Sequence, residues 1–235
     1  LGEDDIQQVL SRQYDYTYLR PDDDSVSKDV VAAFNPFSLV VEQLRALRSQ
    51  LLLRWFDVDG GGRALAVLSP DAGEGRSFVA ANLAVVFSQL GQRTLLVDAD
   101  LRRPCQHQLF RVPDKLGLSS ILAGRADAPE CISRIARLDG LSVLPAGAVP
   151  PNPQELLSRP QFGALIGTLC GHYEAVIVDT PPAASTADHQ AVASRTRGAI
   201  VVARAHRSSA QRLKALVRSL QDGGTVVVGS VLNQG

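Results

Sequence analysis

Short apolar runs of strand length alternate with segments of helical periodicity along most of this sequence. The apolar runs begin at Leu65, Thr94, Leu141, Ala175, Ala199 and Gly224. Between them, apolar residues recur with the spacing that is typical of amphipathic helices. Strands that alternate with helices favour a parallel sheet. We therefore predict an α/β fold with a mostly parallel sheet and helices on both faces.

The first long helix shows how the pattern is interpreted. Asn35 is predicted as its N-cap and Pro36 as its first residue. Its buried stripe is predicted to be Val40, Leu44, Leu47 and Leu51. Trp55 and Phe56 would close the helix, and the glycines at 60–62 would form a flexible connection. Further helices are expected to begin near Arg76, Gly117, Asn152, Thr186 and Ser208.

The first 30 residues differ from the rest of the chain. Residues 1–13 predict a helix, residues 14–19 alternate like a strand, and residues 20–27 read as a linker. The spacing of Leu1, Asp5, Ile6, Leu10 and Gln13 resembles the second half of the N-terminal domain of type II secretion ATPases. We expect residues 1–30 to be a fragment of such an accessory domain and residues 31–235 to be the main domain. The tyrosines at 14, 16 and 18 are interpreted as packing residues rather than phosphoacceptors.

Length, composition and charge narrow the range of possible functions. At 235 residues the length suits one α/β domain with a small appendage. The 24 basic and 24 acidic residues balance, so nothing indicates nucleic-acid binding. No apolar run is long enough to span a bilayer, and no signal peptide is recognisable. Three unpatterned cysteines suit reduced thiols in the cytoplasm, and the absence of Met leads us to expect a piece of a longer protein.

A candidate phosphate-binding loop follows the run that begins at Leu65. The chain breaks at Ser69-Pro70, passes through Gly73 and Gly75, and continues as an Ala-rich helix that should end before Gly91. Free backbone N–H groups at such a helix start bind phosphate. The usual motif has Lys where Arg76 stands and Gly where Pro70 stands. A plain loop between strand and helix is therefore the alternative.

Two further apolar runs end in carboxylates. One ends at Asp98 and Asp100, and the other at Asp179. Ligands of open α/β sheets bind at the carboxyl ends of the strands, so three such ends predict a magnesium–nucleotide phosphate site. Arg102 and Arg103 follow directly. They could assist phosphate binding or form salt bridges to Asp100 or elsewhere.

Five motifs occur together in this chain: Glu42-x-x-Arg45-x-x-Arg48, Gly73-Glu74-Gly75-Arg76-Ser77, Asp98-Ala99-Asp100, Asn152-Pro153-x-Glu155 and Asp179-Thr180-Pro181-Pro182. Their conjunction resembles the bacterial tyrosine kinase family over roughly residues 31–235, and most of all the EpsG-type chain-length-determinant kinases of exopolysaccharide gene clusters. The resemblance implies the P-loop NTPase fold shared with MinD-like ATPases. In this family the second, third and fifth motifs are called Walker A, A′ and B.

The resemblance also implies ligands and roles. ATP or ADP would be held by Gly73, Glu74, Gly75, Arg76, Ser77 and Phe78. Mg²⁺ would be bound by Ser77, by Asp179 directly or through water, and by Asp98 if that residue does not instead take the tyrosine proton. Asp100 would support Asp98, and Arg76 would take the catalytic place of the Walker A lysine. Asn233 would contact adenine, or is a plain turn residue at a strand end.

Assembly and partners follow from the same resemblance. Glu42, Arg45 and Arg48 would mediate homo-oligomer formation, although a solvated ion-pair face is the alternative. The activating partner would be a membrane polysaccharide co-polymerase, so the chain would be cytoplasmic and peripheral to the inner membrane. The substrates would be tyrosines of a C-terminal tail. No tyrosine follows Asn233, so we expect that tail to be absent or to lie outside this sequence.

Three functions therefore remain open. The first is an ATP-dependent autokinase that regulates exopolysaccharide chain length and export. The second is a nucleotide-binding pseudokinase that acts as a scaffold or switch in polysaccharide assembly, because Arg76 replaces the lysine. The third, a partitioning ATPase, is disfavoured because residues 69–72 lack the extra lysine of that class and no basic amphipathic helix is found at a terminus.

Overall fold

The computed structural model describes residues 18–59 and 61–234, and in them a single sheet has the order β3-β4-β2-β5-β1-β6-β7. All neighbouring strands are parallel except the short β3, which pairs antiparallel with β4. The bounds are β1 (Ala64–Leu68), β2 (Thr94–Asp98), β3 (Ser133–Arg134), β4 (Leu141–Leu144), β5 (Ala175–Asp179), β6 (Gly198–Arg204) and β7 (Val226–Asn233). The predicted α/β fold is confirmed.

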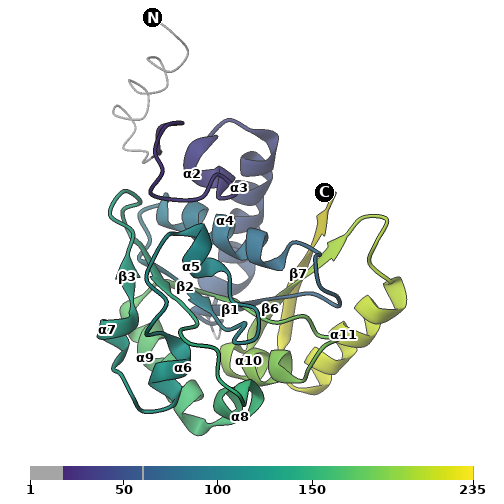
Figure 1. The fold of residues 1–235 in the computed structure, drawn as a ribbon. Helices are drawn as coiled ribbons and strands as arrows, with labels where there is room; N and C mark the ends of the chain where they lie inside the picture. The colour runs from purple at the N-terminus through teal and green to yellow at the C-terminus, as the bar shows by residue number, and fades with distance from the viewer. Residues whose placement is uncertain (1–17, 60, 235) are drawn as a thin grey trace, which may run out of the picture.

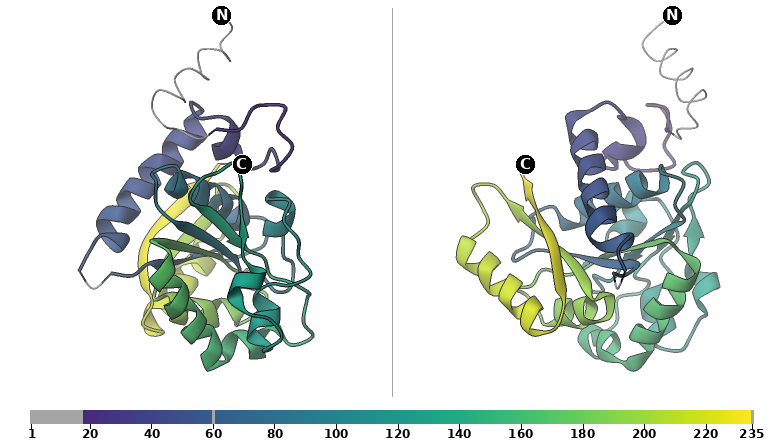
Figure 2. Two further views of the ribbon diagram at one scale, coloured as in Figure 1. Left: turned by 90° about the vertical axis from the view of Figure 1, so that its left-hand side faces the viewer. Right: turned by 180° about the vertical axis from the view of Figure 1, so that it is seen from behind.

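Helices cover both faces of this sheet (Figure 1). One layer contains α2 (Val31–Phe34), α3 (Leu39–Leu51), the π-helical turn η1 (Leu52–Phe56), α4 (Arg76–Ser88) and α5 (Gln106–Leu109). The other contains α6 (Leu118–Leu122), α7 (Ala128–Cys131), α8 (Pro153–Ser158), α9 (Pro160–His172), α10 (Asp188–Thr196) and α11 (Ala210–Asp222). Figure 2 shows the same two layers from the side and from behind.

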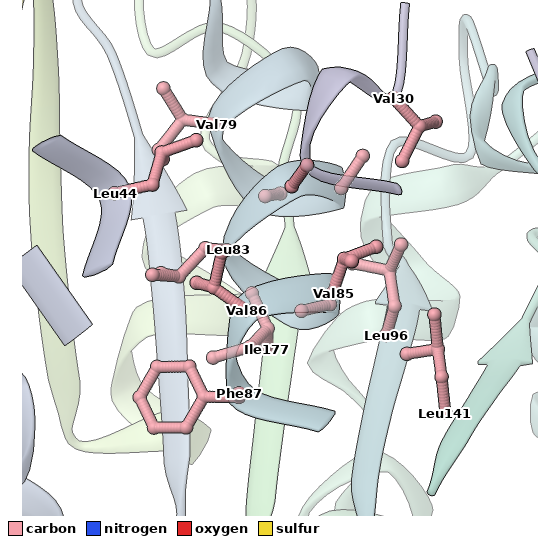
Figure 3. Close-up of a cluster of buried hydrophobic side chains, with 14 of the residues drawn as sticks. Val30, Leu44, Val79, Leu83, Val85, Val86, Phe87, Leu96, Leu141 and Ile177 are labelled. Atoms are coloured by element: carbon pink, nitrogen blue, oxygen red, sulfur yellow. The ribbon is translucent and has the colours of Figure 1, made fainter. Parts of the chain in front are cut away.

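The two faces of the sheet contribute to separate hydrophobic clusters. In β1, Leu65 and Val67 point into one cluster, and Ala66 and Leu68 into the other. Strands that are buried on both faces have no polar side to show, which explains why the sequence presents continuous apolar runs. Around α4, Leu83, Val86 and Phe87 pack near Ile177 of the sheet (Figure 3).

The helix α3 begins three residues later than the sequence predicted. Its N-cap is Ser38, whose hydroxyl accepts a hydrogen bond from the N–H of Val41, whereas Asn35 ends the preceding helix α2. The residue before a proline avoids the helical region, and that favours a helix end at Asn35. The buried stripe shifts with the start of the helix: Val41 is fully buried, whereas Val40 is 44% exposed. The predicted cap and Val40 are therefore wrong.

The glycines at 61, 62 and 198 leave room for close packing against Trp55. A Cβ on Gly62 would lie 2.7 Å from the Trp55 ring, and one on Gly198 would lie 2.3 Å from it. The indole N–H of Trp55 donates to the carbonyl of Ala64 over 2.9 Å. The side chain of Trp55 therefore occupies the space beside Gly62 and Gly198, whereas a Cβ on Gly61 would lie 1.9 Å from the carbonyl oxygen of Trp55. The flexibility of this connection stays a prediction.

The described part of the N-terminal segment packs on the main domain. Val26 and Val30 are fully buried in the cluster around α4. The N–H of Ser27 donates to the carbonyl of Leu109 over 2.7 Å. The boundary predicted after residue 30 therefore falls inside a continuous core. Residues 18 and 19 are not in a strand, and residues 1–17, with the predicted helix and secretion-ATPase likeness, lie outside the described residues.

Hydropathy gives one further result. Within residues 18–59 and 61–234, the helices are all too short or too polar to cross a membrane.

Candidate nucleotide and metal site

The site lies where two neighbouring strands send the chain to opposite faces of the sheet. β1 leads into α4 on one face, and its neighbour β5 leads into α10 on the other. A crevice forms at such a switch point, beyond the carboxyl ends of the strands. β2 lies on the other side of β5, and Asp98 pairs in register with Asp179. The sheet therefore brings the two acidic strand ends next to the phosphate loop, which we define as residues 69–75.

Two glycines give this loop its shape. Gly73 and Gly75 have φ values of 74° and 98°, which residues with a side chain rarely adopt. A Cβ on Gly75 would lie 2.3 Å from the amide nitrogen of Asn233. No side chain of the described residues caps the start of α4 at Gly75. The first N–H groups of α4 are thus available to an anion, as the motif predicted.

Glu74 and Asn233 hold the loop in place. Glu74 is fully buried, and its carboxylate accepts hydrogen bonds from the N–H of Asp71 and the hydroxyl of Ser208. The amide of Asn233, at the end of β7, donates to the carbonyl of Glu74 over 3.1 Å. The last strand is therefore fastened to the phosphate loop by a side chain that the sequence placed at the nucleotide.

The side chain of Arg76 is buried and lies against the phosphate loop. Its Nη1 donates to the hydroxyl of Ser69 over 2.6 Å and to the carbonyl of Asp71 over 3.1 Å. Its Nε donates to the carbonyl of Thr180 over 2.8 Å, and its Nη2 lies 3.9 Å from Asp100 Oδ2. Only 7% of the residue is exposed. The guanidinium therefore links the ends of β1, β2 and β5.

The acidic pair Asp98 and Asp179 is fully buried. Burial, and then the negative charge of Asp179, raise the pKa of Asp98 well above its usual value. Burial also raises the pKa of Asp179. Asp98 is held by backbone donors, since Oδ2 accepts from the N–H groups of Cys105 and Gln106 and Oδ1 from that of Asp100. Two neighbouring buried carboxylates repel each other when both are ionised, so a bound cation would stabilise the charged pair.

Asp179 offers an oxygen to such a cation. Its buried Oδ1 has no hydrogen-bond partner within the described ranges. The positive charge of Arg76, and then a hydrogen bond from the Ser77 hydroxyl, act on the pKa of Asp179 against the raising effect of burial. Within the same residues, no cluster of three or more His, Cys, Asp or Glu side chains is arranged around one metal position. Mg²⁺ commonly uses one or two carboxylates together with phosphate oxygens, so these residues fit a nucleotide-bound Mg²⁺.

Sequence reasoning missed Gln106. This fully buried residue donates from Nε2 to Asp179 Oδ2 over 2.7 Å and to the carbonyl of Ser77 over 3.2 Å. Its side chain therefore connects the loop after β2 to two of the three predicted metal ligands, Ser77 and Asp179. The sequence gives no signal for this role beyond a polar residue in the short segment after Asp98.

The structure shows a side-chain partner for one of the two arginines that follow Asp100. Arg102 forms a bidentate salt bridge with the buried Asp188, with Nε 2.7 Å from Oδ2. Of the two alternatives, the structure shows the salt bridge. Arg103 is exposed, and its backbone N–H donates to Asp100 Oδ1 over 3.0 Å.

The charged residues of α3 lie apart from this site. Glu42 pairs with Arg45, which also donates to the carbonyl of Pro36 and the hydroxyl of Tyr18. Arg48 is only 8% exposed and donates to the carbonyl of Val86 over 2.6 Å. Arg48 therefore lies in the buried stripe of α3 rather than beside it, and the oligomer role of the three residues stays a prediction.

Comparison with known proteins matches this geometry. The family model described as "ParA: NUBPL iron-transfer P-loop NTPase" matches residues 62–234. The tyrosine-protein kinase YwqD of Bacillus subtilis is 33% identical over 208 residues, which cover 88% of this chain and 86% of YwqD. The tyrosine-protein kinase Etk of Escherichia coli is 35% identical over 203 residues, 86% of this chain. Here the chain spans only 28% of the relative's length.

Solved structures give the same result. The kinase domain of E. coli Etk superposes with a TM-score of 0.82 at 34% identity, covering 87% of this chain and 79% of that one. The cell division ATPase MinD of Pyrococcus furiosus superposes with a TM-score of 0.65 at 25% identity, covering 73% and 71%. The MinD-like fold expected from the motifs is confirmed. The chain belongs to the bacterial tyrosine kinase family of P-loop NTPases.

Proposed function

We propose that this chain is an ATP-dependent protein tyrosine kinase of the autophosphorylating type, which regulates the chain length and export of an exopolysaccharide. The observation that supports this most is the register of Asp98 with Asp179 beside the phosphate loop. Phosphoryl transfer requires mainly that phosphates be positioned and their charge neutralised. The loop glycines and these two carboxylates meet that requirement.

Each residue has a proposed task. Ser77 and Asp179 Oδ1 would hold Mg²⁺, which neutralises charge on the phosphates when bound. Asp98 would take the tyrosine proton, because three backbone N–H groups fix its carboxylate and its raised pKa makes it a better base. Gly73 and Gly75 would let the backbone approach the phosphates, and Asn233, whose amide donates to the carbonyl of Glu74, would contact adenine.

A second function is favoured by one observation. All the hydrogen bonds of Arg76 end on oxygens of its own fold: Ser69, Asp71 and Thr180. A guanidinium that is committed in this way gives less help to a transferring phosphoryl group than the usual lysine. The second candidate is thus a nucleotide-binding pseudokinase that acts as a scaffold or switch in polysaccharide assembly.

We further propose a homo-oligomer that forms through the charged face of α3, and activation by a membrane polysaccharide co-polymerase. The chain would then be a cytoplasmic protein at the inner membrane. These proposals rest on the family resemblance.

Calorimetry with Mg–ATP, followed by single-turnover transfer from γ-labelled ATP to tyrosine, tests these functions. Binding with transfer supports the kinase, and binding without transfer supports the pseudokinase, provided that the activating partner segment is also included. Absence of binding would contradict both.

A further inference from the structure

A compact turn at residues 205–209 joins β6 to α11 and is fastened to the phosphate loop. The hydroxyl of Ser208 bonds Glu74 and accepts the N–H of Arg204 over 2.7 Å. Arg204 Nη1 in turn donates to the carbonyl of Gly73 over 3.2 Å. His206 has a φ of 58°, a conformation that is uncommon for a residue with a side chain. The turn is therefore held in a defined shape against the loop.

This turn places the guanidinium of Arg207 on the loop backbone. A Cβ on Gly73 would lie 3.3 Å from Nη1 and 3.4 Å from Nη2 of Arg207. In the part of the chain that the structure describes, this guanidinium has no hydrogen bond or ion pair, and the residue is exposed. Its neighbours differ, because Arg204 bonds Gly73 and Arg212 bonds Asp71 over 2.6 Å. Arg207 thus carries the uncommitted charge of this group.

The uncommitted charge matters because of Arg76. At the position where phosphate loops usually carry a mobile ammonium, Arg76 is buried and bonded to Ser69, Asp71 and Thr180. Turning it toward a phosphate would leave those buried acceptors unpaired, which is unfavourable. A planar guanidinium at the loop surface has the geometry to bind phosphate oxygens with two parallel hydrogen bonds.

We propose that Arg207 binds the polyphosphate of the bound nucleotide and supplies, from the β6 side of the loop, the free cation that Arg76 does not offer. This inference rests on the proposed nucleotide binding. We assign Arg207 to the polyphosphate rather than to the base or ribose for two reasons. Gly73, beside which it lies, belongs to the glycine pair of the phosphate loop, and the Arg207 guanidinium is positively charged.

Calorimetric titration of ATP, ADP and AMP in the presence of Mg²⁺ tests the inference with Arg207→Gln. Loss of a hydrogen bond to a charged group predicts about tenfold weaker ATP binding. The loss should be smaller for ADP and absent for AMP. Arg218→Gln is the matched control, since it removes the same charge from an exposed position of α11 and should leave all three affinities unchanged.

Arg207→Lys keeps the test decisive if the Gln variant melts early, because it retains the charge and should bind ATP more tightly than Arg207→Gln. Unchanged ATP affinity in Arg207→Gln, equal losses for ATP and AMP, or equal losses in the Lys and Gln variants would each overturn the inference. In those cases the wild type still binds ATP, so the proposed function stands. A wild type that binds no ATP would overturn both.

Discussion

Arg76 Nε donates a hydrogen bond to the carbonyl of Thr180 over 2.8 Å, and this contact joins the start of α4 to the end of β5. A lysine donates from a single nitrogen and cannot reproduce the separate Nε and Nη1 donors that contact Thr180, Ser69 and Asp71. Arg76, which replaces the usual phosphate-loop lysine, therefore holds the strand ends of the site together as well as supplying a positive charge.

The first prediction concerns Arg76→Lys. The lysine ammonium would not be held by Ser69, Asp71 and Thr180 as the guanidinium is. It should speed phosphoryl transfer by up to about a hundredfold, because a well-placed positive charge stabilises the transition state by that much. The lost hydrogen bonds should lower the free energy of unfolding by about 1–3 kcal/mol. Single-turnover transfer and denaturant unfolding measure the two effects. Arg63→Lys, at the opposite end of β1, is the control. A lysine variant that is no faster would show that Arg76 is catalytically adapted.

The second prediction concerns Asp98→Asn. Phosphoryl transfer should be abolished, because the amide cannot take a proton from tyrosine. The melting temperature should change little, since the amide oxygen can still accept the N–H groups of Cys105 and Gln106. The repulsion with Asp179 disappears, which offsets the lost acceptor for the N–H of Asp100. Thermal melts and phosphotyrosine detection check this, with the exposed Asp139→Asn as control. Full activity in Asp98→Asn would remove it from the mechanism.

The third prediction is a pH dependence of stability. The pKa of Asp98 and of Asp179 is raised in the folded state, whereas unfolded aspartate titrates near 3.8. Above that value the folded state binds more protons than the unfolded state, so the pair's contribution to stability is lost as pH rises. In the absence of nucleotide, melting temperatures measured upward from about pH 5 should show this loss. Asp98→Asn should flatten the curve, and an equal slope in both proteins would contradict the assignment.

The fourth prediction concerns Gln106. Replacing it by Leu removes the amide that donates to Asp179 and to Ser77. The Mg²⁺ concentration needed for tight ADP binding should rise by about tenfold or more, as for other residues that orient metal ligands. Calorimetric titration of ADP at stepped Mg²⁺ concentrations measures this. Gln108→Leu changes an exposed neighbour in the same way. Identical Mg²⁺ dependence in both variants would show that Gln106 only fills space.

The fifth prediction concerns assembly. Glu42→Ala combined with Arg45→Ala should shift any oligomer toward monomer in light scattering, because charged interface residues contribute to specificity. Adding Arg48→Ala should also cost about 1–3 kcal/mol of stability, since its bond to Val86 is buried. Lys214→Ala on α11 is the surface control. If the wild type is monomeric at every concentration, the role does not apply to this chain.

The sequence predicted the sheet well because buried parallel strands are continuous apolar runs, and it predicted the acidic strand ends because parallel strands end at one edge. It failed where contacts join distant segments. Gln106 reaches Asp179, and Arg102 reaches Asp188, only through the fold. Asn35-Pro36 has the composition of a helix start, yet Asn35 ends α2 and Ser38 is the N-cap of α3. Local preference is weak against tertiary contact.

The buried position of Trp55 has a spectroscopic consequence. Trp55 is the chain's single tryptophan, it is 5% exposed, and glycines at 62 and 198 frame its ring. The tryptophan emission of the unlabelled protein, excited selectively over that of its four tyrosines, therefore reports on one position, where η1 meets the sheet. Because η1 continues α3, a red shift if subunits associate would indicate that η1 had moved and exposed Trp55 to water, and an unchanged spectrum would indicate that η1 stays packed on its own domain.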